Sequence, residues 1–314
     1  MTNTHLTNSA SVYASGYVPA ERRIKIYYER WGNPILPPVL FIHGGPGSGF
    51  SAGYQKLFDP EKFNIIFYDQ RGAGKSAPYC SLYHNTTPYL IADIKKLLDY
   101  LHIRRVVIVG PSWGCALGLL FAIAHPECVS GMVLTGVFLA THKEAQSFID
   151  GSTAKFFPRV WEKFTAIIPD DQRHNIARYY LKKLTTGTAE EQEQYAYNWA
   201  LYDISLSVGE LPPDKASQAV HSLSYRSLAL LTAYYIVHDF FIPEGYIVDH
   251  SAVLRSIPIS LIQGTGDAVT PPDAAIALHN RCSQSSLELI DALHSGNDIK
   301  NKLAEQTLRM IAHY

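Results

Sequence analysis

The sequence predicts an α/β protein: a mostly parallel sheet, flanked by helices and interrupted by one long helical insertion. Two observations carry this prediction. Short runs rich in β-branched residues alternate with segments in which apolar residues recur at helical spacing. Between about residues 138 and 250 these runs give way to helical sequence rich in Tyr and Trp. Strands that alternate with helices favour a parallel sheet.

The predicted core strands are continuous apolar runs that end in glycine or polar residues. Runs of this kind suit strands that are covered on both faces. The runs cover residues 38–44, 64–70, 105–110, 131–137 and 258–264, and helical patterns cover residues 87–103 and 115–126.

The change from strand-like to helical sequence near residue 138, and back near residue 250, predicts two domains. At 314 residues the chain can hold a large core and an inserted subdomain. We expect residues 1–137 and 251–314 to form the core, and residues 138–250 to form a helical cap. The polar N-terminal residues lack the apolar stretch of a secretory signal and are expected to form a mobile tail.

Composition limits the kinds of partner that the protein is expected to bind. Lys plus Arg (27) and Asp plus Glu (28) nearly cancel, so neither a nucleic acid nor an anionic membrane surface is indicated. No apolar stretch approaches the roughly 18 residues needed to span a bilayer. The four cysteines show no Cys-x-x-Cys spacing, which predicts reduced thiols in a cytoplasmic protein. The oligomeric state does not follow from the sequence.

Residues 106–126 place a serine at a sharp corner between a strand and a helix. Gly110 and Gly114 flank Ser112 at the spacing that lets the backbone turn tightly. In that geometry the hydroxyl projects above the sheet, and free N–H groups of the helix N-terminus lie beside it. The pattern indicates a nucleophile elbow; the alternative is a serine that merely caps the helix.

A serine nucleophile needs a base that is oriented by an acid, and after such an elbow the expected chain order is Ser, Asp, His. Asp267 follows the predicted strand 258–264, and His294 follows the last apolar segment. We therefore predict a triad of Ser112, Asp267 and His294. The alternatives are a helix cap at Asp267 and a surface loop at His294, with Asp291 as a weaker rival acid.

The segment "FIHGGPGSG" leaves the first predicted core strand. Backbone without side chains can approach a substrate closely, so the N–H of Gly45, or of Gly44, can join that of Trp113 in an oxyanion hole. The alternative is a plain tight turn. His43 is expected to hydrogen-bond within its own loop.

The segment "DQRGAGKS" ends like a phosphate-binding loop, but Asp69 stands where such a loop needs glycine. The glycines between residues 44 and 49 do not match a dinucleotide-binding pattern either. Metal ligands show no recognisable spacing. We therefore expect neither a nucleotide, nor a metal, nor another cofactor.

Five motifs occur in order over nearly the whole chain: "HGGPG", "DQRGAGKS", "GPSWG", "GTGD" and "LHS". Together they resemble the prolyl aminopeptidase (proline iminopeptidase) family of α/β-hydrolase serine peptidases. The resemblance implies an α/β-hydrolase fold with a mostly parallel eight-stranded sheet and a helical cap over the site. It also implies the same triad and removal of an N-terminal residue, preferentially proline, from small peptides.

In this family, acidic residues of the cap hold the free amine of the substrate. A segment resembling the family's Trp-x-x-Trp-Glu occurs at residues 199–203, with aspartate in place of glutamate. The resemblance therefore assigns substrate binding to Trp199, Tyr202 and Asp203. The alternatives are aromatic residues of the cap's own core and a solvated carboxylate.

A second family segment, Glu-Asn-His-Tyr-Phe, corresponds to residues 236–240, and Ile236 stands where the glutamate belongs. Losing one of two carboxylates weakens the attraction for a protonated amine, because ion pairs are strong in a partly dehydrated pocket. Asp239 and Glu244 are candidates to supply the missing charge.

The expected function is that of a serine aminopeptidase that releases proline or another small or apolar residue from short peptides through an acyl-enzyme. An esterase, lactonase or small-amide hydrolase with the same triad is the alternative. A non-catalytic ligand-binding protein on the same fold is the third possibility.

Overall fold

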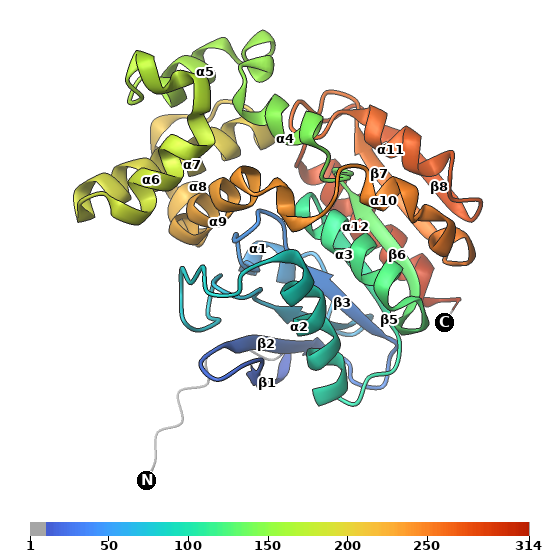
Figure 1. Cartoon of the computed structure of the whole chain (residues 1–314). Coiled ribbons are helices and arrows are strands. Elements are labelled where there is room, and N and C mark those ends of the chain that lie inside the picture. The colour runs from blue at the N-terminus through green and yellow to red at the C-terminus, as the bar shows by residue number, and fades with distance from the viewer. Residues whose placement is uncertain (1–10, 314) are drawn as a thin grey trace.

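The centre of the computed structural model, which describes residues 11–313, is one sheet of eight strands (Figure 1). The strands are β1 (Val12–Pro19), β2 (Lys25–Gly32), β3 (Pro38–Ile42), β4 (Asn64–Tyr68), β5 (Val106–Pro111), β6 (Val129–Thr135), β7 (Ile259–Gly264) and β8 (Ser285–Ile290). Their order across the sheet is β1-β2-β4-β3-β5-β6-β7-β8. The pairs β1–β2 and β2–β4 are antiparallel, and all the others are parallel. The expected mostly parallel sheet of eight strands is confirmed.

The five predicted core strands correspond to β3 to β7, whose residues are almost all buried. Strands β1 and β2 were not predicted, because β1 has partly buried and exposed positions with only Val18 buried, and polar side chains interrupt β2. The expected mobile tail is wrong for residues 12–19, which pair with β2 as a regular edge strand. The rest of that expectation, for residues 1–10, lies outside the described residues.

Helices cover both faces of the sheet. The core helices are α1 (Ala52–Gln55), α2 (Thr87–Tyr100), α3 (Trp113–Ala124), α11 (Pro272–His279) and α12 (Asn297–Ile311). Successive side chains of a strand point to opposite faces. In β3, Leu40 and Ile42 accordingly join the apolar core that contains α2, α3 and α11, whereas Val39 and Phe41 join the core that contains α12.

Six helices between β6 and β7 form a cap on one side of the core (Figure 1). They are α4 (His142–Ile149), α5 (Pro158–Thr165), α6 (Ile176–Thr186), α7 (Ala189–Val208), α8 (Pro213–His221) and α9 (Tyr225–Val237). The next helix, α10 (Tyr246–Asp249), already contacts α3 of the core. The domain boundaries at residues 137/138 and 250/251 stay a prediction.

The cap has an apolar centre of its own, built from aromatic rings. Phe164 stacks on Tyr202 with ring centroids 3.9 Å apart and on Tyr180 at 4.9 Å. Trp199 meets Tyr180 edge-on at 5.0 Å. These rings bury large apolar areas in favourable orientations, so they fix α5, α6 and α7 relative to one another.

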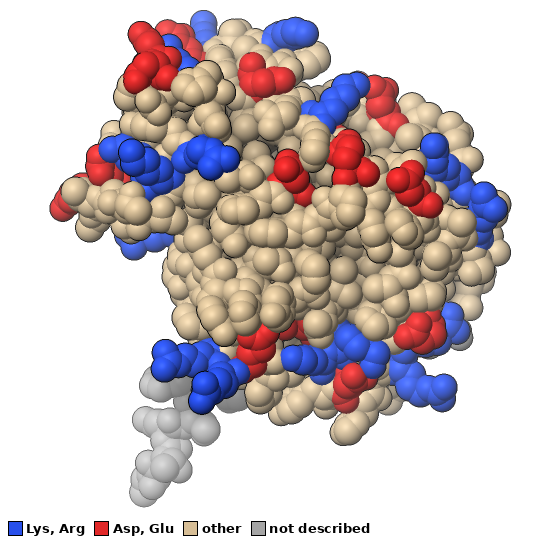
Figure 2. Space-filling view, in the orientation of Figure 1, with Lys and Arg blue, Asp and Glu red and all other residues tan. Residues whose placement is uncertain are grey.

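The surface carries both signs of charge. On the face shown in Figure 2, acidic and basic side chains are interspersed around the periphery, and no large area of one sign is visible. Among the described residues, none of the helices has the length and apolar character that crossing a bilayer requires.

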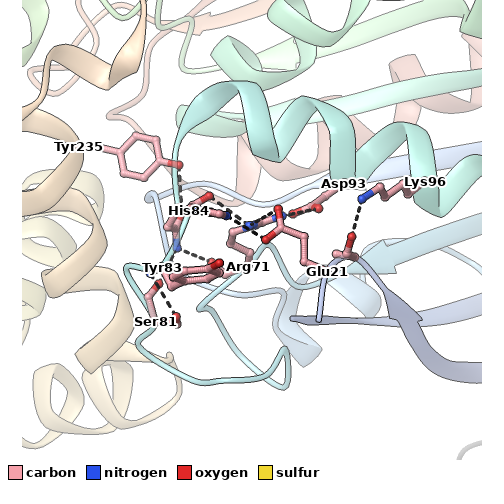
Figure 3. Close-up of polar contacts among 10 residues, drawn as sticks. Glu21, Arg71, Ser81, Tyr83, His84, Asp93, Lys96 and Tyr235 are labelled. Atoms are coloured by element: carbon pink, nitrogen blue, oxygen red, sulfur yellow. Dashed lines mark hydrogen bonds and ion pairs between the residues drawn. The ribbon is translucent and has the colours of Figure 1, made fainter. Parts of the chain in front are cut away.

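A buried ion pair fastens the loop after β4 to α2 (Figure 3). The Arg71 guanidinium, fully withdrawn from solvent, donates from Nε and Nη2 to the two carboxylate oxygens of Asp93, at 2.8 and 2.7 Å. Its Nη1 donates to the carbonyl of His84 at 3.1 Å and lies 3.6 Å from a carboxylate oxygen of Glu21. Such a bidentate pair has a defined geometry, so it holds the loop in one position.

We predict that Asp93→Ala lowers the free energy of unfolding by about 3 kcal/mol, because the buried Arg71 charge loses its bidentate partner and keeps only the longer contact with Glu21. Asp99→Ala is the matched control on the same helix. Asp99 pairs with Lys95 at the surface and is 61% exposed, so its loss should cost about 0.5 kcal/mol or less. Chemical denaturation of both variants measures the difference, and equal losses would contradict the prediction.

Candidate active site

Ser112 lies at the corner between β5 and α3 with φ of 57° and ψ of −123°. Such a backbone conformation costs of order 1 to 3 kcal/mol for a residue with a side chain, and active sites commonly retain it. The turn is possible because glycines lie two residues before and two residues after the serine. A Cβ on Gly114 would lie 2.0 Å from the carbonyl oxygen of Ile42, and one on Gly110 would lie 2.4 Å from the carbonyl oxygen of Gly114.

Asp267 and His294 lie in the loops after β7 and β8 and form a hydrogen bond. The Nδ1–H of His294 donates to Oδ2 of Asp267 at 2.7 Å, which leaves Nε2 free to accept a proton. Asp267 is buried, and its Oδ1 accepts from the backbone N–H groups of Val269 and Thr270, at 2.9 and 2.8 Å. The hydroxyl of Thr270 and the amide of Gln263 donate to Oδ2.

Together, these contacts favour the charged forms of both Asp267 and His294. Burial alone would raise the pKa of Asp267, but the charge and hydrogen bond of His294 outweigh it, and the pKa is lowered. Burial alone would lower the pKa of His294, but the carboxylates of Asp267 and then of Asp203 outweigh it, and the pKa is raised. The imidazole is therefore a stronger base than an isolated one.

Ser112 and His294 meet at the end of β6. The N–H of Ser112 donates to the carbonyl of Thr135 at 2.9 Å. The next residue, Gly136, has φ of 53°, and a Cβ there would lie 2.6 Å from Cε1 of His294. Both side chains line one cavity. Among the described residues no hydrogen bond joins the hydroxyl to the ring, and such bonds often form only when substrate binds.

The predicted oxyanion donors lie on the two segments next to Ser112, the loop after β3 and the start of α3. Gly44 and Gly45 line the cavity, and a Cβ on Gly44 would lie 3.5 Å from that of Ser112. Trp113 is the first residue of α3, so its N–H has no acceptor within the helix. This set of N–H groups can stabilise negative charge that develops on a substrate oxygen bonded to Ser112.

The cavity has a volume of about 530 Å³ and lies between the cap and the carboxyl ends of the strands. A site of this size holds a small molecule. Its apolar walls include the side chains of Phe138, Phe148, Leu228, Ile236 and Phe240. Two carboxylates also line it, those of Glu144 and Asp203.

Asp203 of α7 is the predicted substrate-binding residue that the structure brings to the cavity. Burial raises its pKa to about 6, although the nearby His294 and the hydroxyl of Ser207 favour the charged form. The end of α7 also contacts the loop that carries His294, because the N–H of Ser295 donates to the carbonyl of Ser207 at 2.9 Å. The cap helix therefore places a carboxylate beside the imidazole.

Trp199 and Tyr202 are not brought to the cavity. Both side chains are almost fully buried in the aromatic centre of the cap. The hydroxyl of Tyr202 donates to the carbonyl of Phe148 at 2.6 Å and lies 2.7 Å from the hydroxyl of Thr153. The two residues thus stabilise the cap, and their predicted contact with substrate has no support in this geometry.

Neither candidate for the missing charge lies in the cavity. Ile236 lines it, at the place where the family pattern has glutamate. Asp239 and Glu244 are half-exposed and face His142, with N–O distances of 3.3 and 3.7 Å. The second carboxylate of the cavity is Glu144, which sequence reasoning missed.

Glu144 lies in the first turn of α4 and forms a capping box with Thr141. Its Oε2 accepts from the N–H and the hydroxyl of Thr141, at 2.9 and 2.8 Å, and its Oε1 accepts from the N–H of Leu139 at 3.1 Å. Burial raises the pKa of this carboxyl. The Thr-x-x-Glu spacing was a readable signal for the capping box. It carries no information about the cavity.

Three residues that support Asp267 and His294 were also missed. Thr270 contacts both side chains, Gln263 holds the carboxylate, and Gly136 makes room for the ring. No local pattern reveals these roles. Within residues 11–313, no three His, Cys, Asp or Glu side chains gather as they would around a metal ion.

An eight-stranded, mostly parallel sheet with a strained serine at a strand-to-helix corner defines the α/β-hydrolase class, and the model of the α/β-hydrolase fold family matches residues 37–300. An esterase from Exiguobacterium antarcticum has the same fold, with a TM-score of 0.65 at 18% identity over 95% of this chain and 100% of that one.

A probable proline iminopeptidase from Leptolyngbya boryana is 35% identical to the chain over 304 residues, 96% of this chain and 95% of the relative. A proline iminopeptidase from Arabidopsis thaliana is 34% identical over 91% of this chain and 76% of its own. The chain therefore belongs to the proline iminopeptidase family, as its motifs indicated, and is a hydrolase.

We predict that Gly136→Ala lowers kcat/KM about 100-fold, because the added Cβ overlaps the His294 ring and displaces it. Gly16→Ala is the matched control, since its Cβ would make only an ordinary contact of 3.4 Å with Tyr28. Steady-state kinetics and thermal unfolding of both variants provide the measurement. Wild-type activity in a folded Gly136→Ala enzyme would contradict the proposed place of the ring.

Proposed function

We propose that this protein is a serine aminopeptidase that cleaves the first peptide bond of short peptides with an apolar N-terminal residue. Ser112 is the nucleophile, His294 is the general base and Asp267 orients the imidazole. The strained serine, the 2.7 Å bond between His294 and Asp267 and the shared cavity support these roles.

The reaction proceeds in two stages. Nε2 of His294 takes the proton of Ser112 as its oxygen attacks the carbonyl carbon of the first residue, and the same proton then passes to the leaving amine. The N–H groups of Gly45 and Trp113 stabilise the tetrahedral oxyanion, each worth about 3 to 4 kcal/mol. Water, deprotonated by His294, then attacks the acyl-enzyme. The ester bond to Ser112 breaks, His294 returns the proton to the serine oxygen, and the free amino acid is released.

Recognition of a free N-terminus is carried by Asp203. A substrate whose carbonyl carbon lies at Ser112 has its α-amine two bonds from that carbon, and Asp203 lines the same cavity as Ser112. Asp203 is close enough to His294 that its charge raises the pKa of that ring. A protonated amine between the cap and the triad therefore meets a half-buried carboxylate, where an ion pair is stronger than in water.

The apolar walls favour an apolar side chain at this position, proline included. With Ile236 in place of a second carboxylate, amine recognition depends on fewer charges than the family pattern provides. A hydrolase of blocked esters or amides with the same triad is the competing function, and Ile236 is the observation that favours it.

We also infer a cytoplasmic location. Cys80, Cys115, Cys128 and Cys282 are all free thiols, and three of them are buried. Reducing compartments keep thiols in this state.

We predict that Ser112→Ala lowers kcat/KM for aminoacyl-naphthylamides at least about 10⁴-fold, because no acyl-enzyme can form. A fluorophosphonate probe should label the wild-type serine and leave the variant unlabelled. Mass spectrometry of the labelled peptide identifies the site. Undiminished turnover by Ser112→Ala would overturn the mechanism.

We predict that Asp203→Asn lowers kcat/KM about 10- to 100-fold for a free aminoacyl substrate, because a hydrogen bond to a charged group is worth about 1.5 to 3 kcal/mol. For the N-acetylated substrate the effect should be small. If acetylation leaves wild-type turnover intact, amine recognition is wrong and the competing function stands.

The pH dependence gives an independent check. His294 must be neutral to act as base, and its pKa is raised, so activity is lost as the pH falls through this raised value. Asp203→Asn removes one cause of that increase, so the acid limb for an N-acetylated ester should move to lower pH. For a substrate with a free amine, the acid limb of the wild-type kcat/KM profile should be steeper, because Asp203 also loses its charge near pH 6. Parallel profiles of kcat/KM measure both effects, and superimposable limbs would contradict them.

A further inference from the structure

We propose that Gln70 is a positioning residue that holds both oxyanion donors in place for attack at Ser112. It belongs to the "DQRGAGKS" segment, to which the sequence assigned no role. The inference rests on the proposed function only in taking Ser112 as the nucleophile.

Gln70 bridges the two backbone segments that supply the oxyanion donors. Its Nε2 donates to the carbonyl of His43 at 2.8 Å, just before Gly44 and Gly45. Its Oε1 accepts from the indole Nε1–H of Trp113 at 2.9 Å, just after Ser112. All the side chains in this bridge are buried. One amide therefore sets the separation between the loop after β3 and the start of α3.

The same residue orients the Gly44–Gly45 peptide through His43. The backbone N–H of Gln70 donates to Nε2 of His43 at 3.0 Å, so the neutral ring carries its proton on Nδ1, which donates to the carbonyl of Gly44 at 2.8 Å. Burial lowers the pKa of His43 to about 4, which keeps this tautomer available near neutral pH. In a planar trans peptide the C=O and the next N–H point in opposite directions. Holding the Gly44 carbonyl therefore directs the N–H of Gly45 to the side opposite the His43 ring.

The neighbours of Gln70 immobilise its backbone. The Asp69 carboxylate accepts from the N–H groups of Phe50 and Lys75, at 2.9 and 2.7 Å. On the other side, the Arg71 guanidinium is held by Asp93 (Figure 3). Residues 69–71 are thus held firmly in place, and the side chain of Gln70 extends from them to the loop after β3. A rigid support of this kind is what precise positioning requires.

The test is the rate at which an alkyl fluorophosphonate labels Ser112, because the phosphoryl oxygen gains charge in the oxyanion hole whatever the peptide specificity. Gln70→Met, similar in size but unable to hydrogen-bond in this way, should label about 10- to 100-fold more slowly at the pH plateau. The affinity for a small apolar amine that has no carbonyl oxygen should change less than about twofold, since it places no oxygen in the oxyanion hole.

Trp113→Phe tests the same bridge and retains an aromatic ring. It removes the indole donor to Gln70 and keeps the backbone N–H, so labelling should also slow. In the double variant Gln70→Met/Trp113→Phe the losses should not add, because both break one interaction. Additive losses would overturn the bridge.

Gln263→Met is the matched control, because Gln263 is a second fully buried glutamine that donates to Asp267. It should shift the pH midpoint of labelling, whereas Gln70→Met should lower the plateau at an unchanged midpoint. A shifted midpoint in Gln70→Met, an unchanged plateau, or equal losses in labelling and in affinity for the carbonyl-free amine would each overturn the proposal. If the wild-type serine is not labelled, the proposed function fails first and this inference with it.

Discussion

The site depends on one backbone contact, that between the start of α3 and the end of β3. The Cα of Gly114 lies so close to the carbonyl of Ile42 that a side chain there would have no space. This approach forces the chain through the strained conformation at Ser112. It also brings the loop after β3 against the serine. One packing constraint therefore positions both Ser112 and the loop after β3, which contains Gly44, Gly45, Gly47 and Gly49.

The remaining parts of the site are built around this corner from distant segments. The loops after β7 and β8 deliver Asp267 and His294 to the same edge of the sheet, and Gly136 at the end of β6 leaves room for the ring. The cap encloses the site through α7 and α9. The cap also holds the loop after β3. From α9, the hydroxyl of Ser227 donates to the carbonyl of Gly47, and that of Thr232 donates to the carbonyl of Pro46.

Electrostatics give the cavity its chemical character. Asp203 and the triad share one low-polarity space, so each charge acts on the others with little screening. The burial that raises the pKa of Asp203 also makes its charged form attractive to an ammonium group. Ile236 adds apolar surface where the family pattern has a carboxylate, and the oxygens of Glu144 already accept hydrogen bonds from Leu139 and Thr141. Asp203 is therefore the carboxylate that we propose as the anchor among the hydrophobic walls.

The sequence by itself determined the sheet's buried strands, the corner at Ser112 and the chain order of Asp267 and His294, because continuous apolar runs and tight glycine turns are local properties. It did not reveal β1 and β2, the two antiparallel strands at one end of the sheet, whose mixed polar and apolar residues suit a loop as well as a strand. Tertiary structure alone decided which side of α7 faces the cavity. Apolar and aromatic residues surround that helix, so only packing against distant segments could place Trp199 and Tyr202 in the cap's centre and Asp203 beside the imidazole.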